Sequence, residues 1–95
     1  MKISLHTILG IKQVIGQGSI EIDLPQESTI ADFLAYVKER WGDRLYPHLF
    51  DTVNDTLHPY VRIMVNGRMI QYLQGMNTPL KEGDEVLILP PASGG

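Results

Sequence analysis

The residues best suited to a chemical role are Gly94 and Gly95, the last two of the sequence. A terminal carboxylate is anionic and a poor electrophile, but joining it to a good leaving group makes it an acyl donor. Because glycine lacks a Cβ, a Gly-Gly segment fits a narrow channel and adopts the backbone angles that the channel requires. Pro90 and Pro91 precede this segment and fix two backbone φ angles. Less conformational entropy is therefore lost when the chain end docks on a partner. The sequence therefore predicts a flexible C-terminal tail over residues 91–95, whose carboxylate could react once it is activated.

Other chemistries have little support in the sequence. The chain has no cysteine, which excludes disulfides, cysteine-based metal sites and a cysteine nucleophile. His6, His48 and His58 show no metal-ligand spacing, and we expect no metal site. The chain has no GxGxxG or Walker A pattern and no Ser/His/Asp arrangement in a supporting context, so we expect no cofactor bound by this chain.

Composition limits the class of protein further. A length of 95 residues predicts one domain, and the formal net charge of −3 without a basic run argues against nucleic-acid binding. No segment approaches the roughly 18 consecutive apolar residues of a membrane span. Residues 1–9 do not resemble a signal peptide. We expect a cytoplasmic protein that binds neither nucleic acid nor membrane.

Alternation of apolar and polar residues predicts the strands of a sheet. The predicted strands are residues 2–9, 19–24, 60–65, 68–70 and 85–89. The segment 10–18, with three glycines, is interpreted as the turn between the first two strands. Asn66-Gly67 predicts the turn of a second hairpin, because both residue types tolerate positive φ.

One helix is predicted between the two hairpins. Thr29 is a favourable N-cap with Asp32 at the N3 position, and Gly42 suits the residue after the helix. The apolar residues at helical spacing are Ile30, Phe33, Leu34, Val37 and Trp41. Residues 43–58 are interpreted as a short helical turn plus a loop, and residues 78–84 as turns around a buried Leu80.

This order of elements predicts an α+β fold. Two hairpins flanking one helix fit a mixed sheet of about four to five strands, covered on one face by that main helix. The first and last strands can then pair in parallel at the centre. This arrangement is the β-grasp, or ubiquitin-like, fold, and we expect the domain to span residues 1–90.

A docking surface is predicted beside the tail. If Val86 and Ile88 point inward, Leu87 and Leu89 point outward, and together with Pro90 and Pro91 they are predicted to bind a partner. On the preceding strand, Tyr60, Arg62 and Met64 are predicted to face outward in the same way. An exposed apolar patch beside a reactive end is typical of a partner-binding surface.

The tail and its surroundings resemble a known family. The stretch Leu80-Lys-Glu-Gly83-Asp84-Glu-Val86-Leu-Ile88-Leu-Pro90-Pro91-Ala-Ser-Gly94-Gly95 strongly resembles the small subunit of molybdopterin synthase (MoaD-like proteins). Relatives include the sulfur carriers of the thiamine pathway (ThiS-like) and cysteine pathway, and archaeal ubiquitin-like modifiers. The likeness extends to Val65-Asn66-Gly67-Arg68, Thr78-Pro79-Leu80 and Thr29-Ile30-Ala31-Asp32, and it covers nearly the whole chain.

The resemblance implies a sulfur carrier rather than a stand-alone catalyst. An E1-like adenylating enzyme (MoeB/ThiF-like), using ATP and Mg²⁺, would adenylate Gly95, and the product would become a thiocarboxylate that donates sulfur. The acceptor implied first is the large molybdopterin synthase subunit (MoaE-like), in molybdenum or tungsten cofactor synthesis.

Three alternatives stay open. The chain could serve thiamine or cysteine biosynthesis, could modify proteins by forming isopeptide bonds through Gly95, or could be a non-reactive β-grasp binding module. Loss of function on deleting Gly94-Gly95 would separate the last from the others.

Overall fold

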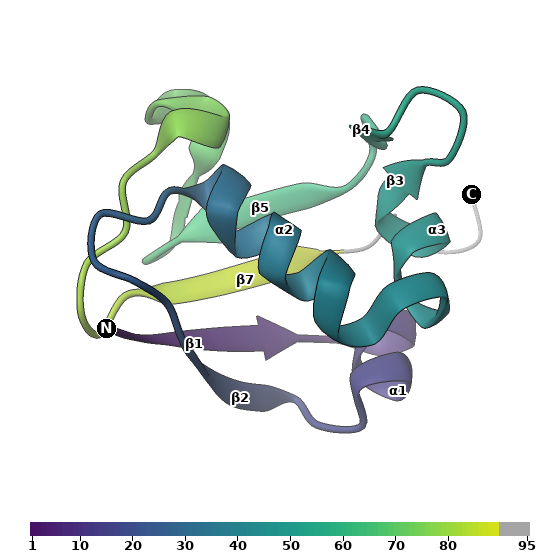
Figure 1. Ribbon diagram of the computed structural model, residues 1–95, viewed down its shortest axis with the longest axis horizontal. Coiled ribbons are helices and arrows are strands. Elements are labelled where there is room, and N and C mark those ends of the chain that lie inside the picture. Colours follow the sequence, from purple (N-terminus) through teal and green to yellow (C-terminus); the bar gives the residue numbers. More distant parts are fainter. Residues whose placement is uncertain (90–95) are drawn as a thin grey trace.

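A five-stranded mixed sheet forms the body of the protein (Figure 1). The computed structural model describes residues 1–89, apart from the side chains of Leu9 and Gly10. The strands are β1 (Lys2–Thr7), β2 (Ser19–Asp23), β5 (Arg62–Val65), β6 (Arg68–Met69) and β7 (Glu85–Leu89). Their order is β2-β1-β7-β5-β6, with β1 and β7 parallel and the other neighbours antiparallel. The predicted β-grasp fold and its central parallel pair are confirmed.

Helix α2 (Ile30–Trp41) crosses one face of the sheet (Figure 1). Its predicted start is confirmed, because the Thr29 side chain accepts from the Asp32 N–H while the Asp32 carboxylate accepts from the Thr29 N–H. Such a capping box satisfies backbone groups that a helix end leaves unpaired. Gly42 follows the helix as predicted.

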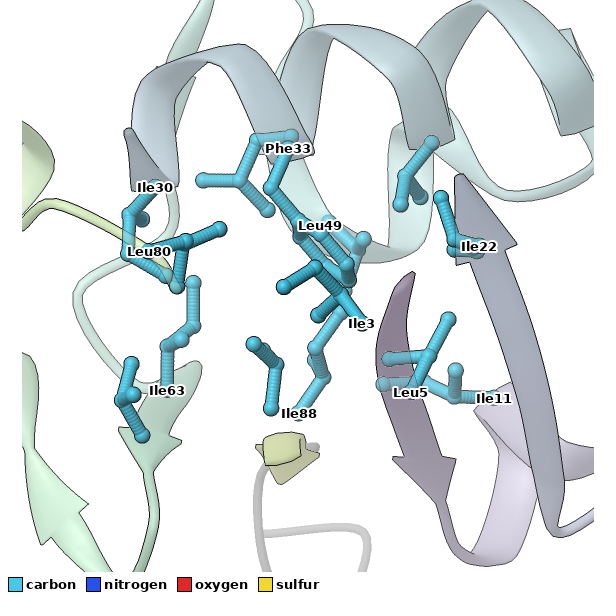
Figure 2. Packing of buried hydrophobic residues seen from close by; sticks show 14 of the residues in the cluster. Ile3, Leu5, Ile11, Ile22, Ile30, Phe33, Leu49, Ile63, Leu80 and Ile88 are labelled. Carbon is cyan, nitrogen blue, oxygen red and sulfur yellow. The ribbon is translucent and has the colours of Figure 1, made fainter. Parts of the chain in front are cut away.

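The core lies between α2 and the sheet, as Figure 2 shows. Phe33 is completely buried against Ile3, Leu5 and Ile88 of the core cluster. Trp41 packs against this cluster but stays partly exposed, so the last turn of the predicted stripe belongs to the rim. Leu80 is buried as predicted.

The predicted glycine-rich turn between β1 and β2 is wrong. The first strand ends at Thr7 rather than Leu9, and helix α1 (Leu9–Ile15) occupies most of the connection. Ile11 fills the core from this helix, with only 2% of its surface exposed. The helix then ends at Gly16, whose φ of 89° is readily accessible only to a residue without a Cβ.

The segment after α2 contains more structure than predicted. A 3₁₀ turn η1 (Gly42–Arg44) and helix α3 (Tyr46–Leu49) supply the expected helical turn. They are followed by a two-stranded ribbon, β3 (Phe50–Asp51) and β4 (Thr56–Leu57), that the sequence analysis missed.

Two strand limits also differ from the prediction. The strand predicted from Tyr60 begins at Arg62, which leaves Tyr60 in the turn after Pro59. The return strand β6 ends at Met69, because Ile70 begins the 3₁₀ turn η2 (Ile70–Tyr72). A third 3₁₀ turn, η3 (Gly75–Asn77), leads toward β7. No helix within residues 1–89 has the length and apolar character to cross a bilayer.

An ionic cluster ties the β3–β4 ribbon to α2. The Lys38 Nζ lies 3.0 Å from Asp55 Oδ1 and 4.6 Å from the centre of the Tyr46 ring, and the Tyr46 hydroxyl donates to the same carboxylate. The hydrogen bond to Asp55 raises the pKa of Tyr46 to about 12. The bonds from Tyr46 and Lys38 hold the pKa of Asp55 below its usual value.

The sheet arrangement predicts that neighbouring residues of β7 contribute very differently to the free energy of unfolding. Ile88→Ala removes a completely buried side chain, so we expect it to lower the free energy of unfolding by about 2–5 kcal/mol. Leu87→Ala, on the outward face, should cost about 1 kcal/mol or less. Urea denaturation followed by tryptophan fluorescence measures both; equal losses would contradict the assigned faces.

The ionic cluster predicts that the pKa of Asp55 depends on its hydrogen bond from Tyr46. In a carboxyl-detected NMR titration, Asp55 should lose its proton below the ordinary aspartate range, and Tyr46→Phe should raise its pKa. Because the folded-state pKa is lowered, the associated stabilisation is present at neutral pH and disappears as pH falls through that lowered value. Asp51, whose pKa is lowered mainly by the Val53 N–H, is the internal control. An unchanged Asp55 titration in Tyr46→Phe would refute the cluster.

Candidate functional site

Strand β7 fixes the point from which the predicted tail continues. It pairs with β1 from Ser4↔Glu85 to Thr7↔Ile88 and with β5 on its other side. Val86 and Ile88 are completely buried beneath α2, so the strand is held on both edges and on one face. Leu89 therefore ends the strand at a defined place in the centre of the sheet.

Four site residues and the predicted tail follow this point. Pro90, Pro91, Gly94 and Gly95, together with the predicted boundary between residues 90 and 91, lie outside the described residues.

A set of turn contacts sets the register of β7. The Asp84 carboxylate accepts from the Lys81 N–H at 2.8 Å and from the Asn66 side-chain amide at 2.9 Å. The Asn66 side-chain oxygen accepts in turn from the Glu85 N–H at 2.9 Å. On the other side, the Gly83 N–H donates to the Lys2 carbonyl at 2.8 Å. The motif residues Asn66 and Asp84 thus position the start of the strand that leads to the tail.

The turn geometry explains the residue types at these positions. Asn66 and Gly67 have φ of 51° and 83°, as the predicted hairpin turn requires, and Gly83 has φ of 86°. A one-residue slip would turn every side chain of β7 to the opposite face. The turns therefore decide which leucines of β7 face outward.

The outward face of the sheet brings most of the predicted docking residues together. Leu87 lies opposite Met64, and Leu89 lies opposite Arg62, in the antiparallel pair of β7 and β5. The outward orientation predicted for these four residues is confirmed by the burial of the residues that alternate with them. Met69 of β6 lies opposite Met64 and extends the apolar row; the sequence analysis missed it because it did not pair β6 residue by residue.

Tyr60 occupies a different setting from the one predicted. It lies in the turn before β5 rather than on the strand, and 49% of its surface is exposed. Its ring stacks on the His58 ring at 4.8 Å with 12° between the planes. The His58 Nε2 lies 3.1 Å from the Pro47 carbonyl oxygen. A partner contact at Tyr60 would therefore use a ring that is already held in place.

The remaining histidines and acids show no second reactive arrangement within residues 1–89. The His6 Nε2 lies 3.5 Å from Glu85 Oε1 on the outward face. No group of three or more histidine, aspartate or glutamate side chains among the described residues is arranged to hold a metal ion. Asp32 and Asp84 are engaged in the helix cap and the turn described above.

Comparison with known proteins agrees with this geometry. The family model described as "ThiS family" matches residues 9–95. The chain is 32% identical to small archaeal modifier protein 3 of Haloferax volcanii over 95 residues, which is all of both chains. It is 36% identical to a putative sulfur carrier protein of Archaeoglobus fulgidus over 81 residues, 85% of this chain and 89% of that one. It is 35% identical to the molybdopterin synthase sulfur carrier subunit of Dictyostelium discoideum over 86 residues, 90% of this chain and 86% of that one.

Solved structures share the fold. The crystal structure of SAMP1 from Haloferax volcanii has a TM-score of 0.85 at 20% identity, with all of both chains covered. A chain of the BexX/CysO complex of Amycolatopsis orientalis has a TM-score of 0.78 at 21% identity, covering 98% of this chain and 99% of that one. At these identities the structures support the fold alone. Together with the family match over most of the chain, they lead to one conclusion: the protein belongs to the ThiS family of ubiquitin-like sulfur carriers.

Proposed function

We propose that this protein carries sulfur as a thiocarboxylate on Gly95. The observation that carries the proposal is the central, doubly paired strand β7, which leads directly into Pro90-Pro91 and Gly94-Gly95. The ThiS family match, which runs through residue 95, supports the same reading. A rigid body that presents a thin C-terminal thread suits a substrate that must enter the active site of another enzyme.

The reaction proceeds in two steps, an adenylyl transfer followed by an acyl transfer. A Gly95 carboxylate oxygen attacks the α-phosphorus of ATP, pyrophosphate leaves, and an acyl-adenylate forms. A sulfide nucleophile then attacks the acyl carbon, the bond from that carbon to the phosphate oxygen breaks, and AMP leaves with the electron pair. The product is a thiocarboxylate with the carbon at an unchanged oxidation level. Adenylation is needed because a free carboxylate has no good leaving group.

The nucleotide and its Mg²⁺ belong to the partner in this proposal. The chain has no glycine-rich phosphate loop, and a carrier needs only to present its carboxylate. The activating partner is an E1-like adenylating enzyme of the MoeB/ThiF type.

The docking patch consists of Tyr60, Arg62, Met64, Leu87 and Leu89. Met64 and Leu87 form an apolar cross-strand pair near the end of β7, and Arg62 adds an exposed cation opposite Leu89. Arginine and tyrosine are enriched among residues that dominate binding energies. A partner with an apolar surface and a carboxylate facing Arg62 would complement this patch.

The sulfur acceptor proposed first is a large molybdopterin synthase subunit of the MoaE type. The Dictyostelium relative named as a molybdopterin synthase sulfur carrier subunit supports this assignment. Thiamine and cysteine biosynthesis are the alternative destinations that the resemblance to the wider family implies.

A second function follows from another relative. The full-length match to a protein named as a small archaeal modifier supports formation of isopeptide bonds through Gly95. Both functions share the adenylated intermediate and differ in the nucleophile, which is sulfide in one case and a lysine amine in the other. Lysine adducts ending in Gly95, recovered from cells by peptide mass spectrometry, would distinguish the modifier.

We expect incubation with an adenylating partner, Mg·ATP and sulfide to exchange one terminal oxygen for sulfur. Intact-mass spectrometry should detect the corresponding increase, and an alkylating reagent should trap the new nucleophilic sulfur. Deletion of Gly95 is the control and should abolish the change. An unaltered mass, with an enzyme that loads another family member in parallel, would refute the proposal.

The docking patch predicts a charge-specific loading defect. Arg62→Glu should lower the kcat/KM of adenylation about tenfold or more, because the exposed cation becomes an anion facing the partner. Lys81→Glu makes the same charge change at the start of the turn before β7 and serves as the matched control. Pyrophosphate release measures both rates; equal defects would place the contact elsewhere.

A further inference from the structure

Strand β2 forms an open edge of the sheet. Among the strands within residues 1–89, its one neighbour is β1, and Figure 1 shows it at the rim of the sheet, away from β5. Edge strands carry a row of backbone groups that can pair with another extended chain. We therefore asked which backbone and side-chain groups β2 offers there.

Hydrogen bonds at both ends of the β1–β2 ladder fix its phase. Met1 and Leu24 exchange both hydrogen bonds, at 2.7 and 2.9 Å. At the other end, the Thr7 N–H donates to the Gly18 carbonyl at 2.9 Å. Because hydrogen-bonded and non-bonded pairs alternate in an antiparallel ladder, the register directs alternate backbone groups of β2 to its free side. The residues whose N–H and C=O groups face that side are Ser19, Glu21 and Asp23.

The side chains along this edge are acidic. Glu21 and Asp23 are exposed on the outward face. A groove of about 440 Å³ continues from the end of β2 to α2, and its lining includes Glu27, Asp32 and Glu39. Cations also lie near this region. Lys2 lies opposite Asp23 on β1, and the Met1 ammonium donates to the Leu24 carbonyl at 2.7 Å. The Lys12 side chain lies beside Gly18, and the Arg40 guanidinium bonds the Tyr36 hydroxyl at 3.2 Å.

These charges disfavour a second copy of the chain as the occupant. Antiparallel pairing of two β2 edges would bring Glu21 and Asp23 of one molecule against the same carboxylates of the other. Like charges opposite each other destabilise a strand pair. The same carboxylates would attract a strand that carries lysine or arginine.

We propose that the β2 edge binds an extended basic segment of a partner protein as an additional strand. The segment's backbone pairs with the free groups of Ser19, Glu21 and Asp23, and its cationic side chains lie beside the two carboxylates. Adding a strand to an open edge combines backbone hydrogen bonds with recognition of alternate side chains. The structure thus specifies both the conformation and the charge of the occupant.

The other face of the added strand meets apolar surface. Ile20 points toward the α2 side of the sheet and stays partly exposed, and Tyr36 of α2 is also partly buried against the core. Tyr36 lines the groove together with Leu24 and Pro25. Side chains between the basic positions of the segment would cover this surface, so the motif alternates basic and aliphatic residues.

This site is separate from the proposed tail chemistry. In the sheet order, β1 lies between β2 and the strand β7 that leads to the tail, and β5 lies beyond β7. Neither Gly95 nor the docking patch takes part in the proposed pairing. Loading of Gly95 and binding at β2 can therefore be tested, and can fail, independently.

The test uses the full chain, labelled with ¹⁵N, and the peptide acetyl-Lys-Val-Lys-Val-Lys-Val-Lys-amide. We expect amide shift changes centred on Ser19, Glu21 and Asp23. Glu21→Lys should weaken binding about three- to tenfold, since an attraction becomes a repulsion at one exposed pair. Glu85→Lys makes the same charge change on β7 and should alter the affinity less than about twofold.

A second peptide separates strand pairing from simple charge attraction. N-methylation of the lysine backbone amides keeps the charge but removes the donors that would face β2, so binding at β2 should be lost. Equal binding of the methylated peptide, shift changes centred outside β2, or an equal effect of Glu85→Lys would overturn the proposal.

Discussion

The parallel pairing of β1 with β7 is the contact on which the rest of the structure depends. It places the last described strand between β1 and β5 rather than at an edge. A parallel pair cannot be closed by a tight turn, so the intervening chain must cross over, and α2 lies on one face of the sheet as a result. One face of β7 is thereby buried, and the opposite face remains for partners. Burial, register and the exit point of the tail are consequences of this single pairing.

Several residues that define the family likeness act through this geometry rather than through chemistry. Asn66 and Asp84 bond each other and the backbone around the start of β7. Gly83 provides a positive φ where the chain turns into that strand. These motif residues can therefore occur together with a reactive chain end, because they fix the position of the strand that precedes it. In this division of roles the folded domain positions the chain end and a partner supplies the chemistry, so a carrier needs few chemically active side chains of its own.

The sequence predicted the elements whose periodicity is long or whose caps are distinctive. The α2 helix, the inward residues of β7 and the Asn66-Gly67 turn were all predictable, since each joins a strong local preference to a clear pattern. Helix α1 was missed because the glycines around it outweighed the helical spacing of Ile11, Val14 and Ile15. The β3–β4 ribbon was missed because strands of two residues show no periodicity. Tyr60 was misplaced because the alternation of β5 extends back to it, whereas the turn at Pro59-Tyr60 delays the start of the strand to Arg62.

The region around β7 and the edge at β2 have different roles in binding. A carrier with one tail can engage only one enzyme active site at a time, so successive enzymes that use both the tail and the docking patch must exclude one another. The β2 edge escapes this restriction, because it lies across β1 from β7 and offers backbone groups rather than the chain end. Its carboxylates oppose pairing with a second copy while favouring a cationic strand. The same acidic residues can thus keep the carrier monomeric at this edge and select what binds there, without altering the position of the tail.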